Sequence, residues 1–96
     1  MILGVIQVSG DDIGIIAMSR QADCIKLHQM FILPEYQKRG IGEACMRRII
    51  EDAASTKLPI RLQVLKVNSR AFTFYQRLGF GKIGETDNHI LMERLS

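Results

Sequence analysis

The chain begins with short apolar runs rich in β-branched residues, a pattern typical of strands. Residues Ile2–Val8 and Ile13–Met18 flank the turn-forming sequence Ser9–Asp12, which predicts a β-hairpin. A third run, Cys24–Leu33, ends before Pro34, a residue that has no backbone N–H to donate to a sheet. The first third of the chain is therefore predicted to form three strands.

The residues of the third run can be assigned to two faces, because successive side chains of a strand point to opposite sides of the sheet. Strict alternation predicts that one face carries Ile25, Leu27, Gln29, Phe31 and Leu33. The other face then carries Lys26, His28, Met30 and Ile32.

The period of the apolar residues changes after this strand. From Gly40 to Ser55 they recur three and four positions apart, which predicts an amphipathic helix. Lys57 and Pro59 follow as stop signals. A strand is then expected over Ile60–Val67, and its alternation changes phase at Val64–Leu65. Either a β-bulge or a strand leaving the sheet explains that change.

Asn68 and Ser69 suit the N-cap of a short second helix that ends near Leu78. Gly79 suits the left-handed position just past a helix end. Two closing strands, Phe80–Glu85 and His89–Leu95, complete the pattern. The order of three strands, a helix, a strand, a helix and two strands predicts a single α+β domain over residues 1–96. We expect two helices on a mixed, mostly antiparallel sheet.

Composition and charge narrow the range of partners. The 96 residues leave room for one domain. Thirteen Lys and Arg residues stand against ten Asp and Glu residues, a formal net charge of +3. These basic residues are spread along the chain and form no single stripe, so nucleic acid is not expected as a partner. A small polyanion would match the same excess of positive charge.

The sequence lacks the patterns typical of membrane proteins, secreted proteins and metal-binding proteins. No apolar run reaches the roughly 18 residues that a membrane span needs, and no secretory signal is visible. Two cysteines, Cys24 and Cys45, make no disulfide framework, so a cytoplasmic protein without a membrane partner is expected. His28 and His89 are far apart in the sequence, and no metal site is predicted.

The segment most suggestive of chemistry joins the third strand to the first helix. Gly40 and Gly42 stand at the start of the predicted helix, directly after Lys38 and Arg39. Glycine lets a ligand approach the backbone closely, and the first N–H groups of a helix are unpaired at its positive end. This combination predicts a phosphate site. The alternative is a flexible turn between strand and helix.

Two well-known phosphate motifs do not fit this segment. A Walker A loop requires Gly-Lys followed by Ser or Thr, which the chain lacks here, and a Rossmann fingerprint requires a third glycine where Cys45 stands. The sequence Gln37–Gly42 instead resembles the Q/R-x-x-G-x-G/A signature of the GNAT acetyltransferase superfamily. The segment Asn68–Phe80 is similar to the N-x-x-A-x-x-x-Y-x-x-x-G-F segment of that family. Both motifs occur in the expected order and on the expected elements.

The resemblance extends over the whole chain and implies a GNAT-like acyl-CoA N-acyltransferase fold. Members usually begin with a strand and one or two helices ahead of the hairpin, so the resemblance implies an N-terminally truncated form. It also implies acetyl-CoA as the cofactor, whose pyrophosphate would be held by the backbone of Gln37, Lys38, Arg39, Gly40, Ile41 and Gly42. The pantetheine arm would pair with the main chain of Met30, Phe31 and Ile32. The side chain of Asn68 would form a hydrogen bond with the same arm.

The reaction implied is direct attack of an amine on the thioester. A protonated amine must first lose a proton to a base. Many members place a glutamate on the fourth strand for this purpose, and His28 occupies the matching position. Histidine can serve as a base near neutral pH, although an exposed histidine without a role is the alternative. Tyr75 would protonate the departing thiolate, and the alternative is a core aromatic residue.

Three functions follow from the sequence. The first is an N-acetyltransferase that uses acetyl-CoA and an amine acceptor. The second is a CoA-binding pseudoenzyme, and the third is an interaction module that keeps only the fold. The apolar strand Ile2–Val8 would leave an open sheet edge, which predicts association into a homodimer.

Overall fold

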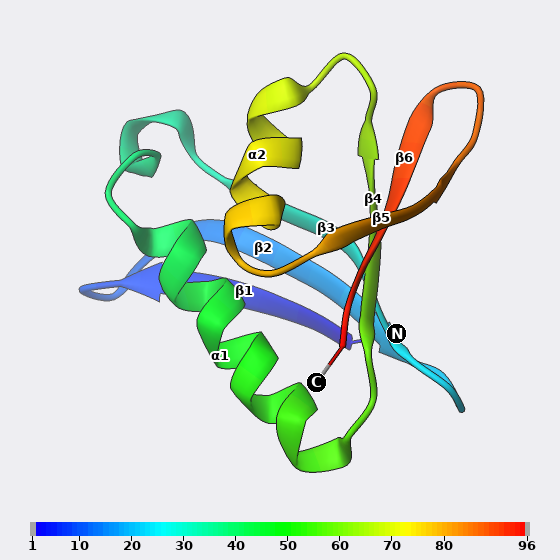
Figure 1. Cartoon of the computed structure of the whole chain (residues 1–96). Helices are drawn as coiled ribbons and strands as arrows, with labels where there is room; N and C mark the ends of the chain where they lie inside the picture. Colours follow the sequence, from blue (N-terminus) through cyan, green and yellow to red (C-terminus); the bar gives the residue numbers. More distant parts are fainter. Residues whose placement is uncertain (1, 96) are drawn as a thin grey trace.

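The computed structural model describes residues 2–95, and its six strands form one sheet in the order β1-β2-β3-β4-β6-β5 (Figure 1). The strands are β1 (Ile2–Val8), β2 (Asp11–Arg20), β3 (Ile25–Ile32), β4 (Ile60–Leu65), β5 (Gly81–Glu85) and β6 (His89–Arg94). A short 3-10 turn η1 (Pro34–Tyr36) precedes α1 (Ile41–Thr56), and α2 (Ser69–Arg77) follows β4. The predicted α+β class and mostly antiparallel sheet are confirmed, while residues 1 and 96 of the predicted domain lie outside the described part.

Local sequence signals account for the ends of most elements. Gly79 follows α2 with φ +96°, in the left-handed region predicted for it. The first hairpin turns at Ser9 and Gly10 alone, both with positive φ, as a two-residue turn of type I′ requires. This turn is shorter than the four-residue cluster predicted, because Asp11 and Asp12 already pair with β1.

The strands β3 and β4 run parallel and pair at only two positions, Ile25 with Ile60 and Lys26 with Arg61. Beyond these positions β4 diverges from β3, while its ladder with β6 continues without interruption to Leu65. Neither explanation offered for Val64–Leu65 applies, because the ladder with β6 has no bulge and β4 stays in the sheet until it ends at Leu65, with Val64 buried and Leu65 exposed as simple alternation requires. The divergence opens a gap beside the second half of β3.

A β-bulge in β3 corrects the predicted faces of that strand. The ladder with β2 passes over His28, because consecutive β2 residues pair with Leu27 and Gln29. The extra residue inverts the alternation that follows it. Leu27 and Ile32 both face the core, 4% and 9% exposed, although they are five residues apart. Phe31 is 44% exposed, so the prediction that it shares a face with Leu27 was wrong.

The main core lies where both helices pack against one face of the sheet (Figure 1). The buried side chains of this core come from β3, α1, β4, the segment that follows α2, and β6: Leu27, Met46, Ile49, Ala53, Ile60, Leu62, Val64, Leu78, Phe80 and Met92. No helix among the described residues combines the length and apolar character that a membrane span requires.

The other face of the sheet carries an exposed apolar stripe across β1, β2 and β3. Val5 pairs with Ile15 in the ladder of β1 and β2, and Ile15 pairs with Phe31 in the ladder of β2 and β3. Their side chains are 58%, 38% and 44% exposed. Neighbouring positions in register bring side chains on one face into contact range, so these three residues form a continuous surface.

Candidate functional site

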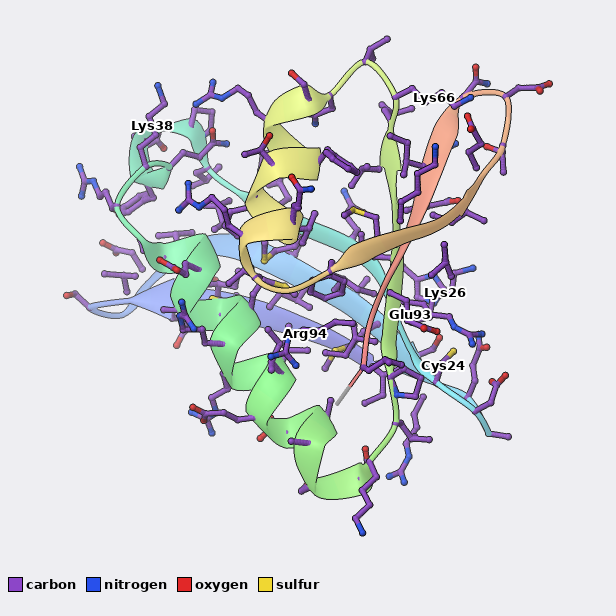
Figure 2. The ribbon with its side chains drawn as sticks, in the orientation of Figure 1. Cys24, Lys26, Lys38, Lys66, Glu93 and Arg94 are labelled. Atoms are coloured by element: carbon purple, nitrogen blue, oxygen red, sulfur yellow. The ribbon has the colours of Figure 1, made fainter. Side chains whose placement is uncertain are left out.

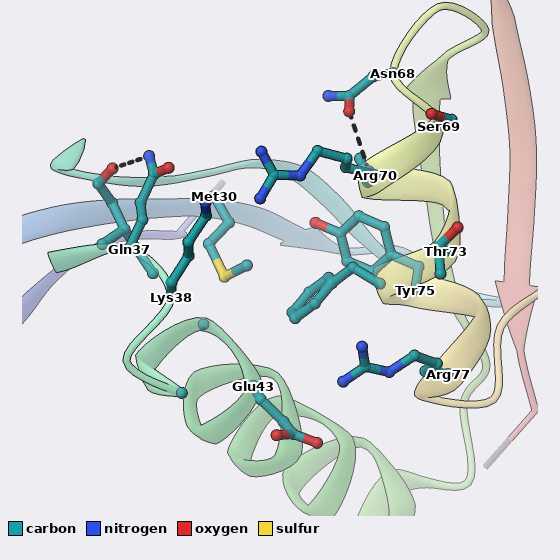
Figure 3. A pocket seen from close by; sticks show the side chains of 15 residues that line it. Met30, Gln37, Lys38, Glu43, Asn68, Ser69, Arg70, Thr73, Tyr75 and Arg77 are labelled. Atoms are coloured by element: carbon teal, nitrogen blue, oxygen red, sulfur yellow. Dashed lines mark hydrogen bonds between the residues drawn. The ribbon is translucent and has the colours of Figure 1, made fainter. Parts of the chain in front are cut away.

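A groove of about 780 Å³ opens between α2 and the loop that leads into α1 (Figure 3). Its size is within the range of small-molecule sites. The lining consists of Met30, Ile32, Gln37, Lys38, Gly40, Gly42, Glu43, Asn68, Ser69, Arg70, Ala71, Thr73, Phe74, Tyr75 and Arg77. The two sequence motifs, which are about 30 residues apart in the chain, thus form opposite walls of one groove.

The loop before α1 turns backbone N–H groups toward a common side. Lys38 and Gly40 have φ of 64° and 77°, whereas Arg39 between them does not have a positive φ. Such alternation produces a concave nest of N–H groups that suits an anion. Helical bonding begins with Ala44 N–H donating to the Gly40 carbonyl, and no described side chain caps this end. The three preceding N–H groups of α1 therefore have no helical partner.

The two glycines of this loop have different surroundings. A Cβ built on Gly40 would meet no atom within 4 Å, so the space beside it is open. A Cβ on Gly42 would lie 3.4 Å from Ile32 Cδ1, 3.7 Å from Phe74 Cζ and 3.8 Å from Met30 Cε. These three side chains form the floor of the groove, and Gly42 brings the backbone of α1 down to it.

The groove is lined by three cationic side chains and by one carboxylate. Lys38, Arg70 and Arg77 make no ion pair with any described residue. The carboxylate of Glu43 accepts a hydrogen bond from Arg47 Nη2 at 2.9 Å, which partly neutralises it. Lys38 extends from the loop on the side of the molecule away from Lys26 (Figure 2). The groove is therefore electropositive and suits an anionic ligand.

The side chain of Gln37 fixes the loop to the sheet. Its Nε2 donates to the carbonyl of Ile32 at 2.8 Å, which ties the loop to the last residue of β3. The guanidinium of Arg39 lies over the ring of Tyr36, 5.4 Å from its centroid. Arg39 and Ile41 are the two predicted phosphate-loop residues whose side chains do not line the groove. Their predicted role is to donate backbone N–H groups to the pyrophosphate, and this role does not require their side chains to line the groove.

The main chain of β3 has one open side. Leu33 N–H donates to the Ile13 carbonyl of β2 at 2.8 Å. In an antiparallel ladder, alternate residues bond to the same neighbour, so Phe31 also turns its main chain to β2. Met30 and Ile32 turn theirs to the gap left by β4. Phe31 also points its side chain away from the groove, so the predicted main-chain pairing with a pantetheine arm has room only at Met30 and Ile32.

Asn68 lies at the mouth of the groove and caps α2. Its Oδ1 accepts a hydrogen bond from Ala71 N–H at 3.0 Å, visible as a dashed line in Figure 3. The predicted N-cap role is therefore confirmed. Because the cap uses only the carbonyl oxygen, the amide nitrogen of Asn68 remains able to donate into the groove.

Tyr75 is held by aromatic contacts with its hydroxyl toward the groove. Its ring meets Phe74 and Phe80 edge to face, with centroids 5.1 Å and 5.6 Å apart. The hydroxyl points toward Met30 in Figure 3. Burial raises the pKa of Tyr75, because the phenolate is poorly solvated there. The residue is thus both a core aromatic and a protonated hydroxyl at the groove.

His28 lies outside this groove. It is the extra residue of the bulge, it is exposed, and its Nε2 lies 2.8 Å from Ser19 Oγ. Because Leu27 faces the core, its neighbour His28 is directed to the opposite face of the sheet. The structure therefore does not bring the two predicted catalytic residues, His28 and Tyr75, into one cavity.

The sequence matches a known protein family over most of its length. The acetyltransferase (GNAT) domain model matches residues 2–82, which include both the phosphate-loop motif and the whole of the second motif. The chain belongs to the GNAT acetyltransferase family. An uncharacterised N-acetyltransferase of Methanocaldococcus jannaschii is 31% identical over 84 residues, which is 79% of this chain and 37% of that protein. N-acetylaspartate synthetase of Danio rerio is 32% identical over 87 residues, 88% of this chain and 31% of that protein.

A solved GNAT structure has the same fold. The PaiA N-acetyltransferase from Thermoplasma acidophilum, crystallised in complex with coenzyme A, superposes with a TM-score of 0.86 at 24% identity. The match covers 94% of this chain and 57% of that one. This GNAT chain spans about a third of the length of the two curated relatives.

The groove of this GNAT domain includes residues that the motifs alone did not indicate. Arg70, Thr73, Phe74 and Arg77 all line it, in addition to the predicted Asn68 and Tyr75. Their spacing of three, four and seven residues is that of one helix face. Helical periodicity within the second motif is therefore the signal that would have found them.

Proposed function

We propose that this protein is an N-acetyltransferase that binds acetyl-CoA in the groove and transfers the acetyl group to an amine by direct attack. The observation that carries the proposal is that both GNAT motifs converge on one electropositive groove whose loop presents unpaired N–H groups. The names of the curated relatives, both of which denote N-acetyl transfer or synthesis, support the same activity.

The residues present fit acetyl-CoA along its length. The N-terminus of α1 and the nest at Lys38–Gly40 suit the pyrophosphate. The main chain of Met30 and the N–H of Ile32 face the gap beside β3, where an extended amide-containing arm can add like a strand. The amide nitrogen of Asn68 can donate to a carbonyl of the same arm.

The chemistry of the chain follows from this placement. Bound acetyl-CoA supplies an activated acetyl group as a thioester. A main-chain N–H of the Met30–Ile32 segment donates to the carbonyl oxygen as negative charge develops on it. Tyr75 donates its hydroxyl proton to the leaving sulfur, and its raised pKa keeps that proton in place. The aromatic contacts of Tyr75 hold the hydroxyl in position for this step.

We propose His28 as the base that accepts the proton of the amine. Its position on the opposite face of the sheet requires the acceptor to reach the thioester through the gap between β3 and β4. His28→Ala should then abolish the acid limb of the pH profile of turnover. Ser19→Ala is the matched control, because it removes the hydrogen bond to His28 and keeps the imidazole. Identical profiles for His28→Ala and the unchanged protein would eliminate this role.

Two measurements test the proposed function. Isothermal titration with acetyl-CoA reports whether the groove binds the donor, and thiol release with a panel of amines reports transfer. Binding together with amine-dependent release is expected. Binding without release for any amine would instead indicate the CoA-binding pseudoenzyme. Absence of binding by the folded protein would refute the proposal and leave the interaction module.

We propose that two copies associate through β1 and the apolar stripe of Val5, Ile15 and Phe31. The strand β1 is an edge of the sheet, and an open edge next to exposed apolar side chains favours association. A two-fold dimer brings the same patch of each copy together, which suits a short stripe of this kind. A second chain placed there could also supply a wall for the acceptor.

The cytoplasm is the compartment we propose for this protein. Cys24 and Cys45 are both free thiols, which suits a reducing environment. Cell fractionation that recovers the protein outside the cytoplasm would contradict this assignment.

A further inference from the structure

Two arginines on α2 face the groove at its two ends. Arg70 and Arg77 are seven residues apart, which is two helical turns and about 10 Å along the axis. Both side chains are exposed, both line the groove, and neither makes an ion pair with a described residue. Such a pair can contact two anionic groups that are separated along one ligand.

The N-terminus of α1 meets α2 between these two arginines. A Cβ on Gly42 would lie 3.7 Å from Phe74 Cζ, so the first turn of α1 is packed beside Phe74. Phe74 is four residues after Arg70 and three residues before Arg77. A pyrophosphate at the unpaired N–H groups of α1 would therefore have one guanidinium on either side of it.

The two ends of the groove differ in what else they contain. In Figure 3, the hydroxyl of Tyr75 points toward the end that holds Arg70 and Asn68, whereas Arg77 points toward the first turn of α1 near Glu43. Because the proposed function pairs the thioester with Tyr75 and the pantetheine arm with Asn68, this arm lies at the end of the groove that holds these two residues. Arg77 then lies on the other side of the pyrophosphate. In CoA, that side carries the ribose with its 3′-phosphate.

We propose that Arg77 binds the ribose 3′-phosphate and makes the groove selective for CoA thioesters over donors that lack this group. This inference rests on the proposed function, since it assumes that the groove binds acetyl-CoA. A guanidinium can hold a phosphate through two parallel hydrogen bonds. The nearby carboxylate of Glu43 makes no ion pair with Arg77 among the described residues, and it accepts a hydrogen bond from Arg47. The excluded donors are dephospho-CoA and phosphopantetheine attached to a carrier protein.

The test compares CoA with dephospho-CoA by isothermal titration of the full chain. The unchanged protein should bind dephospho-CoA about tenfold more weakly, as expected for loss of a charge-assisted contact. Arg77→Ala should weaken CoA binding by about the same factor and leave dephospho-CoA binding unchanged. Arg70→Ala is the matched control, the same substitution on the same helix face, and should not alter the ratio of the two affinities.

Three results would overturn the inference. The first is equal affinity of the unchanged protein for the two ligands. The second is a loss in Arg77→Ala that is the same for both ligands, which would indicate general electrostatic attraction. The third is a change of the affinity ratio in Arg70→Ala alone. Each of these leaves the proposed function intact, whereas failure of the unchanged protein to bind either ligand would refute both. Thermal unfolding of each variant verifies that it is folded.

Discussion

Replacing Gly40 with valine tests directly whether the loop before α1 holds a phosphate. Gly40 has φ +77°, a conformation that costs an L-residue roughly 1–2 kcal/mol. No atom lies within 4 Å of the Cβ position, so the strain is confined to the backbone. For a domain of this size, each kcal/mol corresponds to a decrease in Tm of about 4–8 °C. The variant should therefore fold with a moderately lowered Tm.

The same substitution should affect binding more than folding. The open space beside Gly40 belongs to the groove, so the valine side chain would occupy volume next to the N–H groups of the loop. We expect the Kd for acetyl-CoA to rise about tenfold or more, which is about 1.4 kcal/mol. Isothermal titration should be performed well below the Tm of the variant, with circular dichroism to show that it is folded.

Gly42→Ala is the control for this experiment. Gly42 lies in the first turn of α1, and an added Cβ would make ordinary contacts at 3.4–3.8 Å. Alanine is a better helix former, so this variant should gain up to about 1 kcal/mol of stability. The family signature also allows alanine at this position, and affinity for acetyl-CoA should change little. An unchanged Kd in folded Gly40→Val, or an equal loss in Gly42→Ala, would refute the reasoning.

Three further predictions concern other parts of the chain. Tyr75→Phe keeps the ring and removes the hydroxyl, so kcat should fall while the Kd for acetyl-CoA stays near that of the unchanged protein; equal kcat would assign Tyr75 to the core alone. Val5→Lys should lower both association in light scattering and Tm, because folding and oligomerisation are linked, and a stable monomer of the unchanged protein would contradict the proposed dimer. The pKa of Glu85 is lowered by hydrogen bonds from Lys66 and then Lys82. Ionised Glu85 therefore stabilises the folded protein fully at pH values above the ordinary carboxyl pKa. This stabilisation is lost as the pH falls through the lowered pKa that Glu85 has in the folded state. Urea unfolding should show Glu85→Gln less stable than the unchanged protein at pH 7 and equal to it in strong acid.

The sequence by itself determined the type and order of the elements, because these depend on local properties. Apolar periodicity distinguished strands from helices, and Gly79 and Asn68 indicated the ends of α2 through backbone conformation and capping. The loop Gln37–Gly42 could also be identified as a candidate anion site, since this property of glycines before a helix needs no distant residues. Its binding of a phosphate remains a prediction. The predicted roles of Tyr75 and His28 remain predictions.

Tertiary structure alone decided how the site is assembled. The bulge at His28 arises from pairing with β2, and it reverses the faces that alternation assigns to the rest of β3. The gap beside β3 exists because β4 pairs with β6 beyond Arg61, which no pattern within β3 can reveal. Arg77 reaches the groove because α2 packs beside the first turn of α1. Each of these features depends on contacts between segments distant in the chain, and local propensity carries no information about such contacts.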